Sequence, residues 1–515
     1  MIKSIFFFVI FLLPVLCFSQ KKIKLGDDAL KDEQFYQAIN YYSDYINNSK
    51  KINNHILADL SFKIGYCYKK LSYPELASAY FKQSIDNKYE DPMVNYYYGE
   101  SLQMLQKYDS ALYYFEKFKE LSPHHKFADK GIESITFTHA ALKNPTRYQV
   151  KIVGALNSGE FDYCPFFEAR NNRKIYFTST RYAPNHVTIS PESGDFCSNL
   201  FYSEQNKDGR WSTPSLVPGL INTQNEEGAA CLNRKSNNIY FTRCQHEKNI
   251  DKGCRIYVAR KIGNAWGQVQ EVEIPGIPDN ISIGHPAISD DELTLYFVAD
   301  SLLGGYGGKD IYKVVRDRKN MAFSPPQNLG PVINTEEDEV HPYVRSNGDL
   351  YFSSDGHIGM GGFDIFRAKY IGGTSYEVEN LGSPMNSSHD DFGIAFMGMR
   401  EEGFLSSWRI GGMGKTDIFH FVLPEIKFTV SGKTWDKKTN KPVPYVDIQV
   451  MNDEYVLMDT QTSNESGEYE IDLKPENNYI IYFKAQEYNV VEKAQVETKN
   501  LTDTKHFTRD IFFEK

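Results

Sequence analysis

Four acidic residues begin strand-like runs at corresponding places in a repeated part of the sequence. They are Asp162, Glu227, Glu339 and Asp391. Two carboxylates that flank a glycosidic bond can hydrolyse it, one as the acid and the other as base or nucleophile. An active site, however, gives each group its own role and so breaks the symmetry of a repeat. Because these acids recur with the repeat, the pattern favours a structural function or a symmetric channel.

Two histidines fit the same interpretation, because they also occupy equivalent places. His285 and His341 stand just before Pro286 and Pro342. The sequence contains neither a GxSxG nucleophile elbow nor an HExxH metal-binding helix. It therefore predicts that the chain is not an enzyme, needs no cofactor and has no catalytic, cofactor-binding or metal-binding residues.

A glycine-rich stretch from Ser353 to Phe366, "SSDGHIGMGGFDIF", has the composition of a phosphate-binding loop. Such a loop needs a helix after the glycines, so that free N–H groups face the anion. Here a strand-like run follows, and the phrase recurs in residues 298–312 and 406–419. We therefore expect a tight hairpin, in which an aspartate binds the turn amides. The equivalent aspartates are Asp310, Asp364 and Asp417. A calcium site is not favoured, since no dense run of oxygen ligands surrounds them.

Cys244 and Cys254 flank a polar loop between two strand-like runs, "NNIYFTR" and "RIYVAR". A hairpin brings its two stems together, so a disulfide between these cysteines is expected in an exported protein. A zinc site is less favoured, because the cysteine spacings contain no CxxC pair.

The first residues, "MIKSIFFFVIFLLPVLCFSQKK", predict export. A positive Lys3 precedes an apolar run from Ile5 to Leu16, which is the length of a signal peptide rather than of a membrane span. We expect cleavage after Ser19, giving a signal peptide of residues 1–19. Cys17 does not suggest a lipoprotein, because Leu16 is not the small residue that should precede a lipidated cysteine. The net charge of −10 disfavours nucleic acid as a partner.

Residues 20–142 contain a helical repeat with a period of 34 residues. The period separates Gly65 from Gly99 and Ala77 from Ala111. This frame of small residues resembles the tetratricopeptide repeat (TPR), in which pairs of helices stack into a solenoid. The resemblance implies a concave groove that holds a partner's peptide or helix. The alternative is that the repeats only brace the next domain.

Residues 148–424 repeat a longer unit. Five strand signals, at Tyr176, Tyr240, Tyr296, Tyr351 and Phe404, follow one another at steps of 64, 56, 55 and 53 residues. Short strands at even spacing with glycine and aromatic motifs in each unit indicate a β-propeller. We expect five blades, the last one completed by an N-terminal strand near "VKIVGA". The units resemble the PD40 family of WD40-like repeats.

Residues 426–515 alternate apolar and polar residues around turn signals such as "NKPVP" and "NESG". This pattern resembles the carboxypeptidase-regulatory domain, a transthyretin-like β-sandwich. The expected fold class is therefore multidomain: an α-helical TPR solenoid, a five-bladed β-propeller and a β-sandwich.

This order of domains resembles the PorE-type proteins of the Bacteroidota type IX secretion system. The resemblance implies a periplasmic, outer-membrane-associated scaffold that binds envelope proteins, either outer-membrane β-barrels or secretion-system components, through the TPR groove and the propeller face. In that family an OmpA-like domain follows and binds peptidoglycan. The sequence ends near the point where it would begin, which leaves a shortened paralogue or a truncated gene as alternatives and makes peptidoglycan contact doubtful. A propeller that binds or cleaves a glycan or a peptide is the alternative function.

Overall fold

The computed structural model describes residues 21–49, 51–168, 171–247, 250–373 and 375–514, so the predicted signal peptide lies outside the described residues. The chain divides into two compact units, the first ending at Leu423 and the second beginning at Pro424. Within the described ranges, no helix has both the length and the apolar character needed to cross a bilayer.

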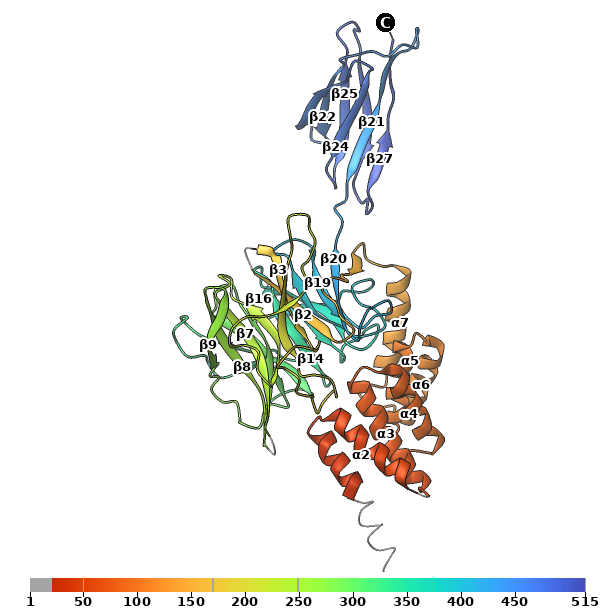
Figure 1. Cartoon of the computed structure of the whole chain (residues 1–515). Helices are drawn as coiled ribbons and strands as arrows, with labels where there is room; N and C mark the ends of the chain where they lie inside the picture. Colours follow the sequence, from red (N-terminus) through yellow and green to blue (C-terminus); the bar gives the residue numbers. More distant parts are fainter. Residues whose placement is uncertain (1–20, 50, 169–170, 248–249, 374, 515) are drawn as a thin grey trace, which may run out of the picture. The chain divides into compact units, whose positions relative to one another are not determined.

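The first unit begins with paired helices that follow a helical segment at residues 21–31. The later helices are α2 (Phe35–Asn48), α3 (Asn54–Lys70), α4 (Pro74–Asp86), α5 (Met93–Met104), α6 (Tyr108–Leu121) and α7 (Lys130–Lys143) (Figure 1). A Cβ at Gly65 would lie 2.8 Å from the Phe81 ring, and one at Gly99 would lie 2.7 Å from the Phe115 ring. Ala77 and Ala111 are fully buried. The 34-residue period is thus a packing period, in which each glycine lets an aromatic ring of the next helix approach.

Five four-stranded antiparallel sheets follow the helices. The first three are β2 (Asp162–Glu168), β3 (Asn171–Ser179), β4 (Asn199–Glu204) and β5 (Ser215–Leu216); β6 (Glu226–Leu232), β7 (Asn238–Glu247), β8 (Ile250–Ile262) and β9 (Ala265–Glu271); and β10 (Ile283–Ile288), β11 (Thr294–Asp300), β12 (Lys309–Val315) and β13 (Gln327–Asn328). The fourth is β14 (Glu339–Val344), β15 (Leu350–Ser354), β16 (Asp364–Gly372) and β17 (Ser375–Asn380).

The fifth sheet combines two distant parts of the chain. Its strands β18 (Asp391–Phe396), β19 (Glu402–Ser407) and β20 (Asp417–Val422) are joined by β1 (Gln149–Ile152), which pairs with β20. The first strands of the sheets adjoin one another in the order β2, β6, β10, β14, β18, and β18 adjoins β2 again. The sheets therefore form a closed, propeller-like ring with these five strands around its axis.

Each strand at the axis contains a β-bulge at the same place. The pairing register shifts there in all five strands, and the bulged residue has a positive φ. These residues are Cys164 (51°), Ala229 (39°), His285 (49°), His341 (52°) and Gly393 (59°). A bulge bends a strand and redirects its side chains. The bulges thus place the side chains of Cys164, Ala229, His285 and His341, and the backbone of Gly393, near the axis.

The second unit contains two further four-stranded sheets. One comprises β21 (Phe428–Asp436), β24 (Glu468–Leu473), β27 (Lys505–Thr508) and β28 (Ile511–Phe513); the other comprises β22 (Asp447–Asn452), β23 (Leu457–Thr462), β25 (Asn478–Lys484) and β26 (Val491–Glu497). Buried residues of both sheets, including Val430, Ile448 and Phe483, belong to one hydrophobic core. The unit is therefore a β-sandwich whose alternating strand pattern has one buried side.

Candidate functional site

The four strand-entry acids are buried, and each is bound to a hydroxyl residue four positions earlier in the chain. All four have no exposed surface. Asp162 accepts hydrogen bonds from the backbone N–H and the hydroxyl of Ser158, both at 2.6 Å, and Glu339 accepts the same pair from Thr335, also at 2.6 Å. Thr223 binds Glu227 in the same way, and the Ser387 N–H donates to Asp391. The acids therefore hold the turns that lead into the ring.

An arginine completes this arrangement in three of the four sheets. Arg181 pairs with Asp162, Arg243 with Glu227 at 2.8 Å, and Arg409 with Asp391 at 2.5 Å. These arginines are the functional partners that the sequence analysis missed. Two of them share a sequence pattern. Arg181 and Arg409 each stand two residues after a serine that pairs with the acid on the neighbouring strand.

Glu339 has no arginine partner, and its pKa is raised. Its cross-strand serine is Ser354, and Gly356 stands two residues later, where the sister sheets have arginine. A Cβ at Gly356 would lie 1.7 Å from the Thr335 hydroxyl oxygen, so a side chain does not fit there. Ser354 donates a 2.6 Å hydrogen bond to Glu339 instead. Burial raises the pKa of Glu339 to about 8.

A cavity of about 300 Å³ lies at the axis of the ring, between the five strands. The imidazoles of His285 and His341 stack there with centroids 3.9 Å apart, and Phe392 stacks on His341 at 5.1 Å. His341 Nδ1 lies 3.2 Å from Cys164 Sγ. Burial lowers the pKa of His285 to about 3 and that of His341 well below its ordinary value, so both rings are neutral.

These residues do not form a metal centre as they are arranged. The two imidazole planes are 12° from parallel, so their nitrogens cannot both point at one ion. Across the described part of the chain, no group of three or more histidine, cysteine, aspartate or glutamate side chains could hold a metal ion. The stacked histidines therefore form a neutral pair that lines the cavity at the axis.

The glycine-rich stretch is a hairpin between β15 and β16, and its aspartate binds the turn. Asp364 Oδ2 accepts hydrogen bonds from the Met360 N–H at 2.5 Å and from Asn380 Nδ2 at 2.8 Å. Asp310 accepts from Tyr306 N–H at 2.7 Å, and Asp417 from Met413 N–H at 2.6 Å. A strand follows each of these turns, so none of them offers the helix N-terminus that a phosphate requires.

Replacing Asp364 by alanine is expected to destabilise the ring by about 1–3 kcal/mol, because the buried Met360 N–H then loses its acceptor. Asp364→Asn keeps an oxygen acceptor and is expected to cost less. Thermal unfolding of the two variants, followed by circular dichroism, measures the difference. Equal melting temperatures for the alanine and asparagine variants would contradict the turn-binding role.

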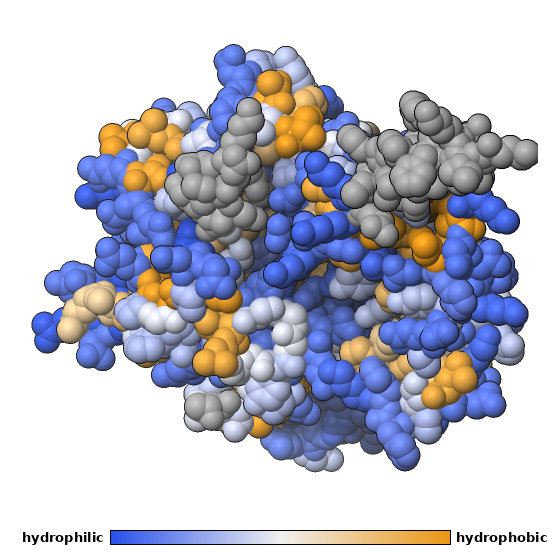
Figure 2. All heavy atoms as spheres, turned by 90° about the horizontal axis from the view of Figure 1, so that it is seen from below, coloured by the Kyte–Doolittle hydropathy of each residue, from blue (hydrophilic) through white to orange (hydrophobic). Residues whose placement is uncertain are grey.

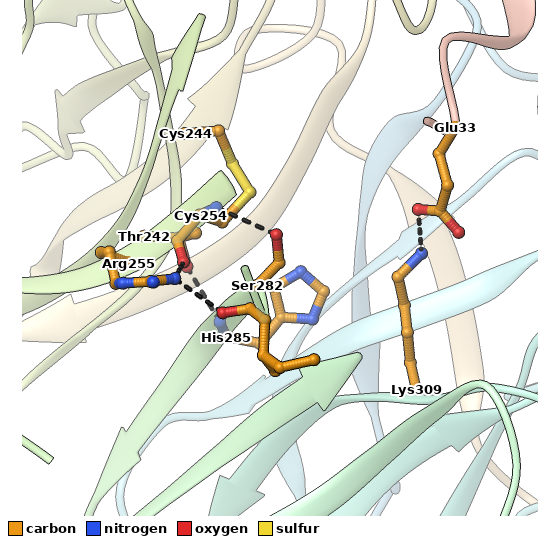
Figure 3. Close-up of a disulfide and its surroundings, with 9 residues drawn as sticks. Glu33, Thr242, Cys244, Cys254, Arg255, Ser282, His285 and Lys309 are labelled. Carbon is orange, nitrogen blue, oxygen red and sulfur yellow. Dashed lines mark hydrogen bonds and ion pairs between the residues drawn. A yellow bond between two sulfur atoms is a disulfide. The ribbon is translucent and has the colours of Figure 1, made fainter. Parts of the chain in front are cut away.

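Cys244 and Cys254 are joined by a disulfide across the β7–β8 hairpin, where they face each other directly. Figure 3 shows the bridge beside Ser282, whose hydroxyl oxygen accepts a 3.1 Å hydrogen bond from the Cys254 N–H. The remaining cysteines of the described residues, Cys67, Cys164, Cys197 and Cys231, are free.

The double variant Cys244→Ser/Cys254→Ser is expected to lose about 2–3 kcal/mol, because the bridge closes a loop of 10 residues that is otherwise free in the unfolded chain. Differential scanning calorimetry with and without a reductant measures this. The reduced wild type serves as the control, since it should melt with the variant. A variant that melts with the oxidised wild type would show that the bridge contributes nothing.

Helices α3, α5 and α7 contact the ring, the last through Lys130, which donates to the Asp355 carbonyl. Lys70 pairs with Asp338 at 2.7 Å, and Lys69 lies 3.8 Å from Asp355. Lys126 pairs with Glu336, and the Gln103 amide donates to the Gly359 carbonyl at 3.2 Å. Figure 3 shows a further ion pair, between Glu33 and Lys309 at 3.0 Å.

These contacts show that the helical repeats brace the ring, which was one of the two roles expected from the sequence. An aromatic contact adds to them, since Tyr73 meets Trp408 edge-to-face at 5.1 Å. The ring therefore already covers part of this helix surface, and a partner protein could bind only the remainder.

No protein-family model matches the chain, and no curated protein matches it. Solved structures match its parts separately. The first TPR domain of Spaghetti (RPAP3), bound to the HSP90 peptide SRMEEVD, is 17% identical over 24% of this chain and 93% of its own, with a TM-score of 0.22. The Arabidopsis OM64 TPR domain is 18% identical over 23% of this chain and 93% of its own, with a TM-score of 0.21.

The sheet region matches arabinanases. The endo-arabinase of Bacteroides thetaiotaomicron VPI-5482 is 13% identical over 54% of this chain and 98% of its own, with a TM-score of 0.36. Arabinanase Arb43A of Bacillus subtilis is 11% identical over 51% and 94%, with a TM-score of 0.35. At these identities the likeness concerns the fold and no residue of a site.

The comparison corrects one prediction. The sequence predicted that the chain is not an enzyme, whereas the two solved structures above that match its sheet region are arabinanases, which are glycoside hydrolases. Repeat symmetry was the physical argument for that exclusion, and it fails because a symmetric framework can still carry a site at its axis. The predictions of a TPR-like helical region and a propeller-like sheet region are confirmed at that level.

Proposed function

We propose that this chain is an exported adaptor that binds envelope proteins at the outer membrane, within a type IX secretion or gliding machinery. One observation supports it most directly: the helical repeats and the ring are joined by largely buried ion pairs such as Lys70–Asp338. Two folds that commonly bind proteins thereby belong to one compact unit. Such a unit can hold two partners close to each other.

The finer assignment of the fold belongs to the same proposal. We infer a five-bladed PD40-type propeller, supported by the closed order of the five axial strands, and a transthyretin-like sandwich in the second unit, supported by its shared core. The order of helical repeats, ring and sandwich supports a relationship to the PorE-type proteins.

The surface favours small, specific contacts with a partner rather than one broad apolar interface. On the face in Figure 2, hydrophilic residues predominate and the hydrophobic ones form small separate groups. Large exposed apolar patches mark many obligate interfaces. On the coloured part of this face, partners would therefore bind through polar contacts and single apolar anchors.

The test is affinity capture from the native cell envelope. A tagged copy of the chain is expected to retain outer-membrane β-barrels or secretion-system components from detergent-solubilised envelopes after mild crosslinking. Untagged cells and a tagged, unrelated exported protein are the controls. Recovery of no envelope protein above these controls would overturn the proposal.

A second candidate is the binding or cleavage of a glycan at the axis. It is favoured by the 300 Å³ cavity, whose lining combines aromatic rings such as Phe396 with charged groups such as Asp290 and Arg345. Purified protein incubated with a panel of polysaccharides, including arabinan, should then bind one of them or release reducing ends. A panel without binding or release would exclude this candidate.

A further inference from the structure

A polar groove of about 460 Å³ lies between the second and third sheets of the ring. One wall is a face of the second sheet and includes Asn238, Arg260 and Gln270, from β7, β8 and β9. The other wall includes Arg316 and Lys319, from the turn that follows β12. The groove shares no lining residue with the cavity at the axis, so it is a separate site.

The charged side chains that line this groove are mostly positive. They are Lys235, Arg260, Arg316 and Lys319, against the single carboxylate of Glu292. That carboxylate is already paired with Lys319 at 2.6 Å. The groove therefore carries an excess of positive charge, in a chain whose net charge is −10.

Two of these positive groups have no partner within the part of the chain that the structure describes. The Lys235 ammonium and the Arg260 guanidinium make no hydrogen bond or ion pair there, and both residues are exposed. The side-chain amides of Gln268 and Gln270, in the same lining, are equally unpaired. The groove thus has positive charge and hydrogen-bonding groups that the described residues do not use.

Other parts of the groove are held in place. Arg316 Nε donates a 2.9 Å hydrogen bond to the Glu292 carbonyl, and its guanidinium lies over the Phe323 ring at 4.5 Å. Lys235 stands in a turn that is closed by the buried Asn233, whose side-chain oxygen accepts two backbone N–H groups at 3.0 and 3.1 Å. A site whose shape is already fixed loses little conformational freedom when a ligand binds.

We propose that this groove binds an anionic saccharide, a sugar that carries a phosphate or carboxylate group. Guanidinium and ammonium groups bind such oxyanions through charge-assisted hydrogen bonds. The unpaired amides can both donate to and accept from sugar hydroxyls. Only Tyr240 and Val258 are apolar among the described lining residues, which disfavours a peptide with apolar anchors. The volume lies within the roughly 300–1,000 Å³ of small-ligand pockets. This inference goes beyond the proposed adaptor function and does not depend on it.

The probes are glucose 6-phosphate and glucuronate, with glucose and inorganic phosphate as comparisons. Isothermal calorimetry on the full chain without its predicted signal peptide, at constant ionic strength, should give saturable binding of at least one anionic sugar. The tighter of the two identifies the acidic group. Glucose should bind roughly 10-fold more weakly, which corresponds to the loss of one charge-assisted hydrogen bond, and inorganic phosphate several-fold more weakly. Glucose or inorganic phosphate that binds as tightly as the anionic sugar, or no saturation by either anionic sugar, would overturn the inference.

Two variants locate the site. Arg260→Gln and Lys235→Gln each remove an unpaired positive charge and should weaken binding of the anionic sugar roughly 10-fold. Arg210→Gln is the matched control, because it removes an exposed guanidinium outside the groove and should leave the affinity unchanged. Calorimetric melting shows whether each variant is folded, and a misfolded one is replaced by Gln270→Ala in the same lining.

An equal loss of affinity in Arg260→Gln and Arg210→Gln would show a general attraction between anions and surface charges rather than a site. Unchanged affinity in a folded groove variant would contradict the site directly. Because the sugars need no envelope partner, this inference can fail while the affinity capture still succeeds.

Discussion

Lys70→Glu is expected to separate the helical repeats from the ring and to cost about 3–5 kcal/mol of stability, the usual effect of breaking a buried ion pair from one side. The side chains of Lys70 and Asp338 are 18% and 10% exposed. Burial opposes the charge of Asp338, yet Lys70 and Lys309 hold its pKa well below the ordinary value. A glutamate at position 70 would place two negative charges together in a poorly hydrated interface.

Two measurements separate undocking from global unfolding. Calorimetry reports the loss of stability, and limited proteolysis of the connection between α7 and β1 reports release of the helices. Trp408 adds a local reporter, since its contact with Tyr73 exists only while the two parts are docked. Melting and cleavage of Lys70→Glu at wild-type levels would show that this ion pair does not hold the interface.

A surface ion pair provides the matched control. Lys82 and Asp86 pair one helical turn apart on α4, with 47% and 57% of their side chains exposed. Exposed pairs contribute little, so Lys82→Glu is expected to change stability by less than about 1 kcal/mol. The charge swap Lys70→Glu/Asp338→Lys should recover part of the loss if the attraction between the two positions is what matters.

The periodic features of this fold could be predicted from the sequence because they depend on local packing. Gly65 and Gly99 repeat at 34 residues since each must admit an aromatic ring of the following helix. Asp364 and its sisters recur because each hairpin needs an acceptor for its turn amides. Even the pairing of β1 with β20 followed from counting repeated phrases, since a closed ring must use an N-terminal strand to complete the last sheet.

The features that depend on distant residues could not be predicted in this way. Lys70 and Asp338 are 268 positions apart, and nothing in either neighbourhood indicates its partner. The stacking of His285 on His341 requires the ring to be closed and both strands to bulge at the same place. The recurrence of the strand-entry acids did favour a structural role, but the hydroxyl and arginine groups that bind them could not be predicted.

Replacing Glu339 is the second change with a large expected effect. It depends on pH, and it should stabilise the fold, whereas Lys70→Glu should destabilise it. Its pKa is raised by burial to about 8 in the folded ring, against an ordinary value near 4.5. Between these values the unfolded chain gives up the proton while the folded chain retains it. The contribution of Glu339 to stability is therefore fully present below pH 4.5 and is lost as the pH rises to about 8, by roughly 1.4 kcal/mol for each pH unit.

Glu339→Gln should remove this pH-dependent loss, because a neutral amide carries no buried charge. Its one oxygen can still accept from the hydroxyls of Thr335 and Ser354, whereas the Thr335 N–H loses its acceptor at every pH. The free energy of unfolding of the variant relative to wild type, measured by thermal melting, is expected to increase steadily from pH 5 to pH 8.5, by up to about 4 kcal/mol. Asp391→Asn is the matched control, since its acid occupies the equivalent turn but faces Arg409. Removing that charge leaves a mostly buried guanidinium unpaired, so the control should be destabilised by about 3 kcal/mol at every pH. A constant difference between Glu339→Gln and wild type across the range would mean that Glu339 is already ionised in the folded ring, and that a group other than arginine balances its charge.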